Sequence, residues 1–300
     1  MQGMDSGMED KVVLITGGTG GIGKETAKGL AKLGARVIIT GRNEKRGEAA
    51  VAEIQQESGN ENVGLMTADL SSQTEIRRLA DEFEKNNSRL DVLINNVGGL
   101  YRKRWLTVDG IEATFAINAL APFLLTRELL PLLRATAPAR VMFVTGGMPG
   151  RIDLENLQAE KGHLGLRTYS HAKAAMMALA FEQAWWLEGT GVSANVAYPG
   201  AAYTDMTKAM TPDMFPGVMR VLWPVFRFFM GNAKPEKAAR SSIYLASSPE
   251  VADINGVYFN TNSKKSRWPR DVLDDRKRLS LWETAERLTG LVLQQQGLKL

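Results

Sequence analysis

"KVVLITGGTGGIGKETAKGLAKLG", residues 11–34, decides the fold of this chain. Residues 11–16 form a short, almost uninterrupted apolar run, which is typical of a parallel strand buried on both faces. A glycine-rich turn follows, and "KETAKGLAKLG" then has the spacing of an amphipathic helix that stops at Gly34. The stretch therefore predicts a strand, a tight turn and a helix in direct succession.

The same alternation continues along most of the chain. Further strands are expected at 35–40, 63–70, 90–98, 140–145, 191–200 and 256–260. Helices are expected at 44–58 and 72–86, near 111–134 and 168–187, at 235–247 and at about 271–289. This rhythm predicts a single α/β domain, a Rossmann-like doubly wound parallel sheet of about seven strands.

Composition excludes several classes of protein. The 300 residues are 44% hydrophobic and 23% charged, as in a soluble globular protein, and the net charge of +4 is too diffuse to indicate nucleic-acid binding. With no cysteine and two histidines, neither a disulfide framework nor a metal site is expected. The polar start is not expected to act as a signal peptide, and the apolar stretch 214–230 is too short and interrupted to cross a membrane. A cytoplasmic protein is the expectation.

The turn "TGGTGGIG", 16–23, is suited to a dinucleotide. Its first glycine permits a tight turn, its second lets the backbone approach a pyrophosphate, and its third allows close packing of helix on sheet. The helix N-terminus adds free N–H groups and a partial positive charge. A purely structural glycine turn is the alternative. The candidate cofactor contacts in this turn are Gly17, Thr19, Gly21, Ile22 and Gly23.

The end of the second strand selects the cofactor. An NAD enzyme usually carries an acidic residue there, whereas this chain has Thr40, Gly41 and Arg42. Gly41 brings no carboxylate to repel a 2′-phosphate, and Arg42 can donate to one. NADP(H) is therefore favoured, with a solvated loop arginine as the alternative role for Arg42.

"YSHAK", 169–173, places Tyr169 and Lys173 on one face of a helix. A neighbouring ammonium is expected to lower the pKa of the tyrosine hydroxyl, so that the pair can exchange a proton with a carbonyl or alcohol oxygen. The pattern alone is common by chance, and it gains weight from the motifs that precede it. His171 points off this face and is expected to be structural.

These motifs, with "NNVG" at 95–98, Asn118 in "FAINALAPF" and "YPGAAYT" at 198–204, resemble the short-chain dehydrogenase/reductase superfamily over about residues 10–260. "DGIEATFAINALAPFLLT" and "IDLENLQAEK" are similar to its retinol dehydrogenase-like branch. The resemblance implies an NADP(H)-linked oxidoreductase that interconverts apolar aldehydes or ketones and alcohols.

The resemblance also implies roles for individual residues. Tyr169 is the general acid/base, Lys173 assists it and binds the nicotinamide ribose, and Asn118 holds a water in the proton relay. A buried asparagine that bonds only backbone is the alternative for Asn118. Further residues are implied to surround the cofactor: Asp69 and Leu70 at the adenine, Asn95 and Gly98 in the cleft, and Pro199, Gly200 and Thr204 beside the nicotinamide.

One expected residue is missing. The family strand normally ends in two serines, and "RVMFVTGG" puts Thr145 and Gly146 there. Three interpretations remain: Thr145 supplies the hydroxyl, Tyr169 works without it, or catalysis is lost. Removal of one such donor in other enzymes costs roughly 10²–10³ in rate, which damages catalysis without abolishing it.

The segment 203–231 follows the loop that faces the nicotinamide, where this superfamily builds a substrate lid. Its methionines and aromatics suit a bulky apolar ligand, and ordinary core packing is the alternative. A peripheral membrane contact is a third possible role for this segment, because Arg220 and Arg227 flank apolar residues. Trp185 and Trp186 lie on the helix after Lys173, where the family often pairs subunits, so a homodimer is a further expectation.

We therefore expect a flexible segment 1–10, an NADP(H)-binding catalytic domain 11–262 with its lid at 203–231, and a C-terminal basic loop and helix 263–300. A non-catalytic NADP(H)-binding protein and a biosynthetic ketoreductase acting on an aromatic or polyketide product are the alternatives. The expected partner is a small apolar carbonyl or alcohol substrate.

Overall fold

Eight hydrogen-bonded strands form the centre of the computed structural model, which describes residues 7–147 and 150–291. Their order across the sheet is β3-β2-β1-β4-β5-β6-β7-β8. All neighbours are parallel except β7 and β8, which pair antiparallel. The strands span Val12–Ile15 (β1), Arg36–Gly41 (β2), Val63–Thr67 (β3), Val92–Asn95 (β4), Ala139–Val144 (β5), Val192–Ala197 (β6), Tyr258–Phe259 (β7) and Lys265–Ser266 (β8).

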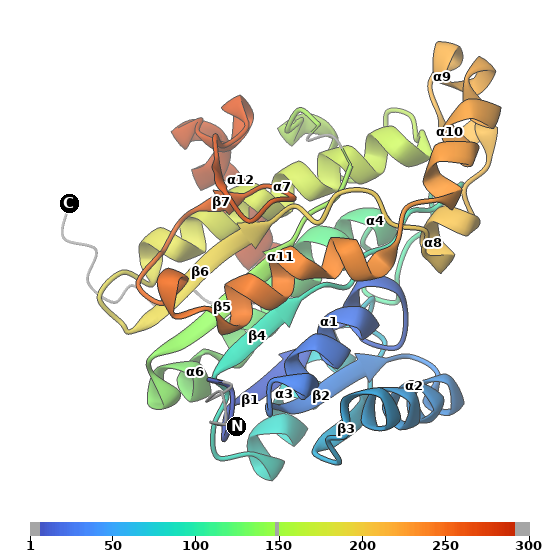
Figure 1. Ribbon diagram of the computed structural model, residues 1–300. Helices are drawn as coiled ribbons and strands as arrows, with labels where there is room; N and C mark the ends of the chain where they lie inside the picture. Colours follow the sequence, from blue (N-terminus) through green and yellow to red (C-terminus); the bar gives the residue numbers. More distant parts are fainter. Residues whose placement is uncertain (1–6, 148–149, 292–300) are drawn as a thin grey trace.

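Helices cover both faces of this sheet (Figure 1). On one face lie α1, Gly21–Lys32, α2, Glu44–Ser58, and α11, Pro235–Ser247. On the other lie α3, Gln73–Asn86, α5, Ala121–Glu128, and α7, Gly165–Trp186. The expected doubly wound α/β fold is confirmed, and β8 is an added antiparallel edge strand from the basic loop.

The helix expected near 111–134 is not continuous. It consists of α4, Ala113–Phe115, a π-helical turn at Ala116–Leu120, then α5 and α6, Leu130–Thr136. Pro131 lies in the first turn of α6, and because proline lacks an N–H it begins a new helix rather than extending α5. π-turns inside helices often mark functional positions, and this one contains Asn118.

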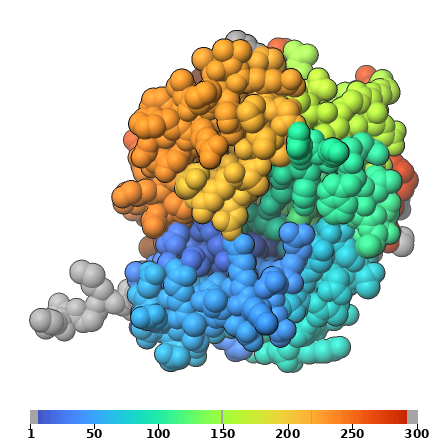
Figure 2. Space-filling model, turned by 90° about the vertical axis from the view of Figure 1, so that its right-hand side faces the viewer, coloured from blue at the N-terminus to red at the C-terminus, as the bar shows by residue number. Residues whose placement is uncertain are grey.

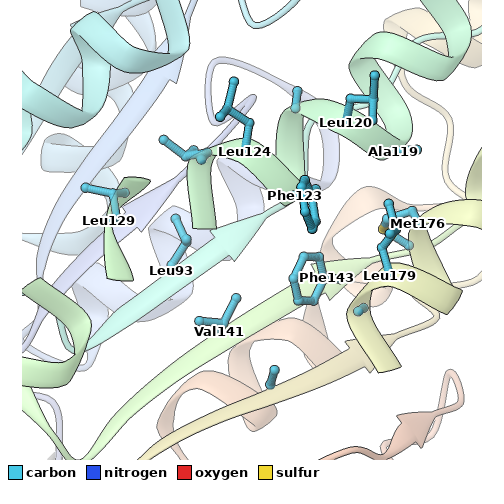
Figure 3. Packing of buried hydrophobic residues seen from close by; sticks show 14 of the residues in the cluster. Leu93, Ala119, Leu120, Phe123, Leu124, Leu129, Val141, Phe143, Met176 and Leu179 are labelled. Carbon is cyan, nitrogen blue, oxygen red and sulfur yellow. The ribbon is translucent and has the colours of Figure 1, made fainter. Parts of the chain in front are cut away.

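Figure 3 shows the apolar core between the sheet and α5 and α7. Phe123 of α5 and Phe143 of β5 are almost fully buried there, with Leu93, Met176 and Leu179 around them. Full burial of one such side chain stabilises a fold by roughly 1.5–3 kcal/mol. This core fixes α7 against β5, and so it sets where Tyr169 and Lys173 lie.

The C-terminal helix α12, Asp275–Thr289, packs across α5 and α7. Its Trp282 contacts Phe123 edge-on and lies 6.5 Å from Trp186, while the Arg127 guanidinium stacks 4.4 Å above the Trp186 ring. The same chain therefore covers the Trp186 end of α7, whereas Trp185 is exposed. A homodimer formed through α7 stays a prediction.

The segment 203–231 contains three short α-helices. They are α8, Asp205–Lys208, α9, Gly217–Val221, and α10, Trp223–Gly231. No single helix in the described part of the chain is long and apolar enough to cross a membrane. Residues 113–128 and 130–136 reach the length and apolar composition of a membrane span only when taken together, and this pair is bent by 55°.

Candidate active site

A cleft of about 210 Å³ opens at the carboxyl ends of β1 and β4, where the strand order reverses. Figure 2 shows the hollow between residues near 205–235 (yellow to orange) and the N-terminal part of the chain (blue). Nine of the predicted site residues line it: Gly17, Thr19, Gly21, Ile22, Gly98, Thr145, Tyr169, Lys173 and Thr204. The other lining residues are Gly20, Arg46, Asn96, Val97, Val144, Asp205 and Met206.

The glycine-rich turn has the geometry that its sequence indicated. Gly17 and Gly21 have φ angles of +67° and +53°, a conformation that favours glycine. A Cβ on Gly23 would collide with the Gly17 carbonyl. α1 then begins at Gly21 with no side-chain cap and no acidic residue in its first turn. Its first N–H groups are thus suited to an anionic group such as a pyrophosphate.

Two arginines follow β2, whose end lies next to the glycine-rich turn. Arg42 is exposed just after β2, while a Cβ on Gly41 would collide with Thr19. Arg46, which the sequence analysis missed, lines the cleft, with its Nε 3.4 Å from the Thr19 carbonyl oxygen. Its guanidinium also pairs with Asp205 at 2.5 Å. The one available signal was its position in the sequence, four residues beyond Arg42.

Tyr169 and Lys173 lie together on α7 and are almost fully buried. The Lys173 Nζ donates to the Val144 carbonyl at 3.1 Å and lies 5.9 Å from the centroid of the Tyr169 ring. Burial lowers the pKa of Lys173 to about 8 and raises the pKa of Tyr169. The expected lowering of the tyrosine pKa was therefore wrong for this structure, because desolvation dominates and the ammonium is directed at Val144.

Asn118 is completely buried and bonds only backbone. Its Nδ2 donates to the carbonyls of Gly99 at 2.7 Å and Thr114 at 2.8 Å, and its Oδ1 accepts from the Gly99 N–H. These bonds agree with the alternative role given for Asn118, a buried asparagine that bonds only backbone. They also join the π-helical turn to the loop after β4, where a Cβ on Gly98 would lie 3.4 Å from the Lys173 Nζ.

Thr145 and Gly146 lie at the tip of β5, beside Tyr169. The Thr145 N–H donates to the Ala197 carbonyl at 2.9 Å, which continues the pairing of β5 with β6, and its side chain lines the cleft. A Cβ on Gly146 would lie 2.5 Å from the Tyr169 hydroxyl oxygen. The tyrosine hydroxyl therefore occupies the space of the absent serine side chain.

Several residues predicted to contact the cofactor do not line the cleft. Asn95 points away from the cleft and donates to Thr126 at 3.0 Å, because side chains alternate along a strand, so its neighbour Asn96 lines the cleft instead. Leu70 is buried in the core, and the Asp69 carboxylate accepts from Ser71. Pro199 and Gly200 lie in the loop after β6, outside this lining.

The segment 203–231, the expected lid, contacts the glycine-rich turn and the start of α2. A Cβ on Gly21 would lie 2.7 Å from the Thr204 methyl, and Asp205 reaches Arg46. Of the lid's methionine and aromatic side chains, Met206 lines the cleft, while Met214 and Phe215 are buried. No group of side chains suited to a metal ion was found within residues 7–147 and 150–291.

Comparisons with known proteins agree with this architecture. Residues 11–214 match the sequence profile of the family described as short chain dehydrogenase. Human retinol dehydrogenase 13 is 34% identical, with 94% of this chain and 85% of that protein covered. Human dehydrogenase/reductase SDR family member 13 is 36% identical, with 95% of this chain and 74% of that protein covered.

Solved structures show the same fold. A protein from Mycobacterium paratuberculosis superposes with a TM-score of 0.73 at 28% identity, with 94% of each chain covered. Pseudomonas aeruginosa RhlG, solved as an NADP active-site complex, gives a TM-score of 0.67 at 29% identity, with 85% of this chain and 96% of that chain covered. The chain belongs to the short-chain dehydrogenase/reductase superfamily of oxidoreductases, in its retinol dehydrogenase-like branch.

Proposed function

We propose that this protein is an NADP(H)-dependent oxidoreductase that interconverts an apolar aldehyde or ketone and its alcohol. One observation carries the proposal: the Tyr169 hydroxyl and the Lys173 ammonium are buried together in a cleft that also reaches the glycine-rich turn. A dinucleotide held on that turn would extend along the cleft toward Tyr169.

The residues present fit such a cofactor. The uncapped start of α1 and the positive φ angles of Gly17 and Gly21 would hold the pyrophosphate. Arg42 and Arg46 are suited to a 2′-phosphate, and no acidic residue stands at the end of β2. RhlG, a structural relative, was solved with NADP. When bound, the reduced nicotinamide supplies the hydride.

Tyr169 supplies the proton in this proposal. Because burial keeps its pKa above the ordinary value, the hydroxyl stays protonated at neutral pH and can act as a general acid toward a carbonyl oxygen. The carbonyl oxygen gains the proton as its carbon gains hydride, and Tyr169 is left as a phenolate. Lys173, one helical turn away, holds its ammonium on the Val144 carbonyl here and would stabilise that anion by turning toward it as it forms.

The strand tip supplies the second hydroxyl. We assign it to Thr145, because its side chain lines the same cleft as Tyr169 whereas Gly146 has none. In this position it would donate to the substrate oxygen and share the charge that develops there.

The substrate side supports an apolar ligand. Met206 lines the cleft beside Thr204, and the lid above it is built from aromatic and aliphatic side chains. The curated relatives include proteins named retinol dehydrogenases, whose named substrate is a long apolar alcohol. We propose aldehydes and ketones of that class for this chain.

The testing experiment follows oxidation of NADPH, and separately of NADH, with a panel of apolar aldehydes and aromatic ketones. Wild type and Tyr169→Phe are compared, and cofactor binding is titrated in both by nicotinamide fluorescence. We expect turnover with NADPH, and its near-complete loss in Tyr169→Phe with binding preserved. Tight NADPH binding without turnover on any member of the panel would instead favour a non-catalytic cofactor-binding protein.

A further inference from the structure

The helical unit formed by α9 and α10 has two different faces. Side chains at 223, 226 and 230 repeat at helical spacing and are half-buried. The opposite face carries five large apolar side chains that are exposed: Val221, Leu222, Val225, Phe228 and Phe229. Their spacing places them together on one side of the helix.

The inner face accounts for the packing of this unit. Phe215, which is almost fully buried, lies 5.0 Å from Trp223 and 5.2 Å from Phe226 between ring centroids. This cluster holds α10 against the chain that precedes it. The outer face has no such partner, since Phe228 and Phe229 are 71% and 69% exposed and contact each other edge-on.

An apolar face of this kind is unusual on a surface. Isolated exposed apolar residues are ordinary, but a contiguous group on one helical face indicates an interaction site. In Figure 1, α9 and α10 stand out from the rest of the fold at the end where the cleft opens. The face is therefore accessible to a large partner, beyond the cleft itself.

The charges around this face point to the kind of partner. Between residues 214 and 235 the chain has three basic residues, Arg220, Arg227 and Lys234, and no acidic one. None of the three forms an ion pair with a carboxylate in the described part of the chain, although Arg220 donates to the Phe215 carbonyl. The nearest acidic residue before them, Asp213, pairs with Arg102.

Within residues 214–235 the apolar side chains are bordered by basic ones alone, and the next carboxylate is Glu236 in the first turn of α11. This pattern matches an anionic membrane surface, with acyl chains below and negative headgroups around them. A second copy of the chain matches less well. A symmetric dimer through this face would bring the basic residues of one copy toward the basic residues of the other, and such like-charge contacts are unfavourable. We propose that the α9–α10 outer face binds the surface of an anionic lipid bilayer, with Phe228 and Phe229 entering the acyl boundary.

The test is flotation of the full chain with vesicles. One set contains phosphatidylcholine alone, and the other contains phosphatidylcholine mixed with phosphatidylglycerol. We expect binding to the mixed vesicles and at least tenfold weaker binding after Phe228→Ser with Phe229→Ser. Arg227→Gln and Lys234→Gln should each weaken binding to the anionic vesicles roughly fivefold, the effect of one basic residue near such a surface.

Leu279→Ser is the matched control, because Leu279 is an exposed apolar residue on α12 and should leave flotation unchanged. NADPH titration in every variant reports whether the fold and the cofactor site are intact. Flotation does not depend on turnover, so the vesicle test stays valid even if the proposed enzymatic activity is not found. Wild type that floats with neither vesicle, or equal flotation of the double variant, would overturn the proposal. A solution dimer that the double variant dissociates, without flotation, would identify a second copy as the occupant.

Discussion

The Tyr169 hydroxyl oxygen lies 2.5 Å from the place that a Cβ on Gly146 would take. No real side chain tolerates that approach, so the tyrosine position seen here requires glycine at 146. The missing serine and the place of Tyr169 are thus one feature of this site. Burial of Tyr169 against the strand tip also explains why its pKa is raised.

Restoring the serine should therefore harm the enzyme. In Gly146→Ser, Tyr169 must shift by several tenths of an ångström, and a misplacement approaching 1 Å can cost about 10² in rate. We expect kcat/KM to fall by that order, with NADPH affinity nearly unchanged. Gly64→Ser is the control, because a Cβ there meets nothing within 4 Å. Equal or higher activity in Gly146→Ser would show that the tyrosine is not constrained by this glycine.

Thr145 provides the next test. Thr145→Val keeps the side-chain shape and removes the hydroxyl, while Thr145→Ser keeps the hydroxyl. If Thr145 donates to the substrate oxygen, the valine variant should lose roughly 10²–10³ in kcat and the serine variant should retain most activity. Steady-state kinetics on the best substrate of the panel decide this. Similar rates for valine variant and wild type would mean that Tyr169 acts without a second hydroxyl.

The sequence predicted features that depend on local pattern. Each strand from β1 to β6 is a short apolar run, and the glycine turn needs only the positive φ angles that its own residues supply. The helix break at Ala116–Leu120 was not predictable, because Asn118 bonds the carbonyl and the N–H of Gly99 in the loop after β4, nineteen residues earlier in the chain. The spacing of apolar residues in this stretch would be the same if the helix were unbroken.

The same limit applies to the site. Arg46 reads as an exposed residue in the first turn of α2, and only the packing of α1 against α2 brings it over Gly20. The direction of the Tyr169 pKa shift depends on burial and on where the Lys173 ammonium points. Neither is encoded in the spacing of the two residues along α7.

Burial of Lys173 should appear in the pH dependence of stability. Its folded pKa of about 8 lies below its ordinary value of 10.5, so the unfolded chain binds more protons between these pH values. Below pH 8 the full cost of burying the ammonium is present, and stability should rise as pH increases from 8 toward 10. The expected gain at pH 10 is about 2 kcal/mol.

Denaturant unfolding of the cofactor-free protein at several pH values measures this gain. Lys173→Met removes the titrating group, so its free energy of unfolding should not rise over the same window. An equal rise in both proteins would assign the effect to other groups.

The choice of cofactor depends on Arg42 and Arg46 in this proposal. Arg42→Ala should weaken NADPH binding roughly 10- to 150-fold, the value of one charge-assisted bond, and leave NADH binding nearly unchanged. Fluorescence titration of both cofactors measures the ratio. Equal losses for NADPH and NADH would show that Arg42 does not contact the 2′-phosphate.

Arg46 differs from Arg42 because its guanidinium already pairs with Asp205 of the lid. If Arg46 binds a cofactor phosphate, Asp205 competes for it, so Arg46→Ala should weaken NADPH binding and Asp205→Asn should strengthen it a few-fold. The exposed pair itself contributes no more than about 1 kcal/mol, which limits the gain. If the pair only fastens the lid to the turn, both variants should change NADPH affinity in the same direction. The signs of the two changes, measured by the same titration, therefore separate a phosphate-binding arginine from a structural one.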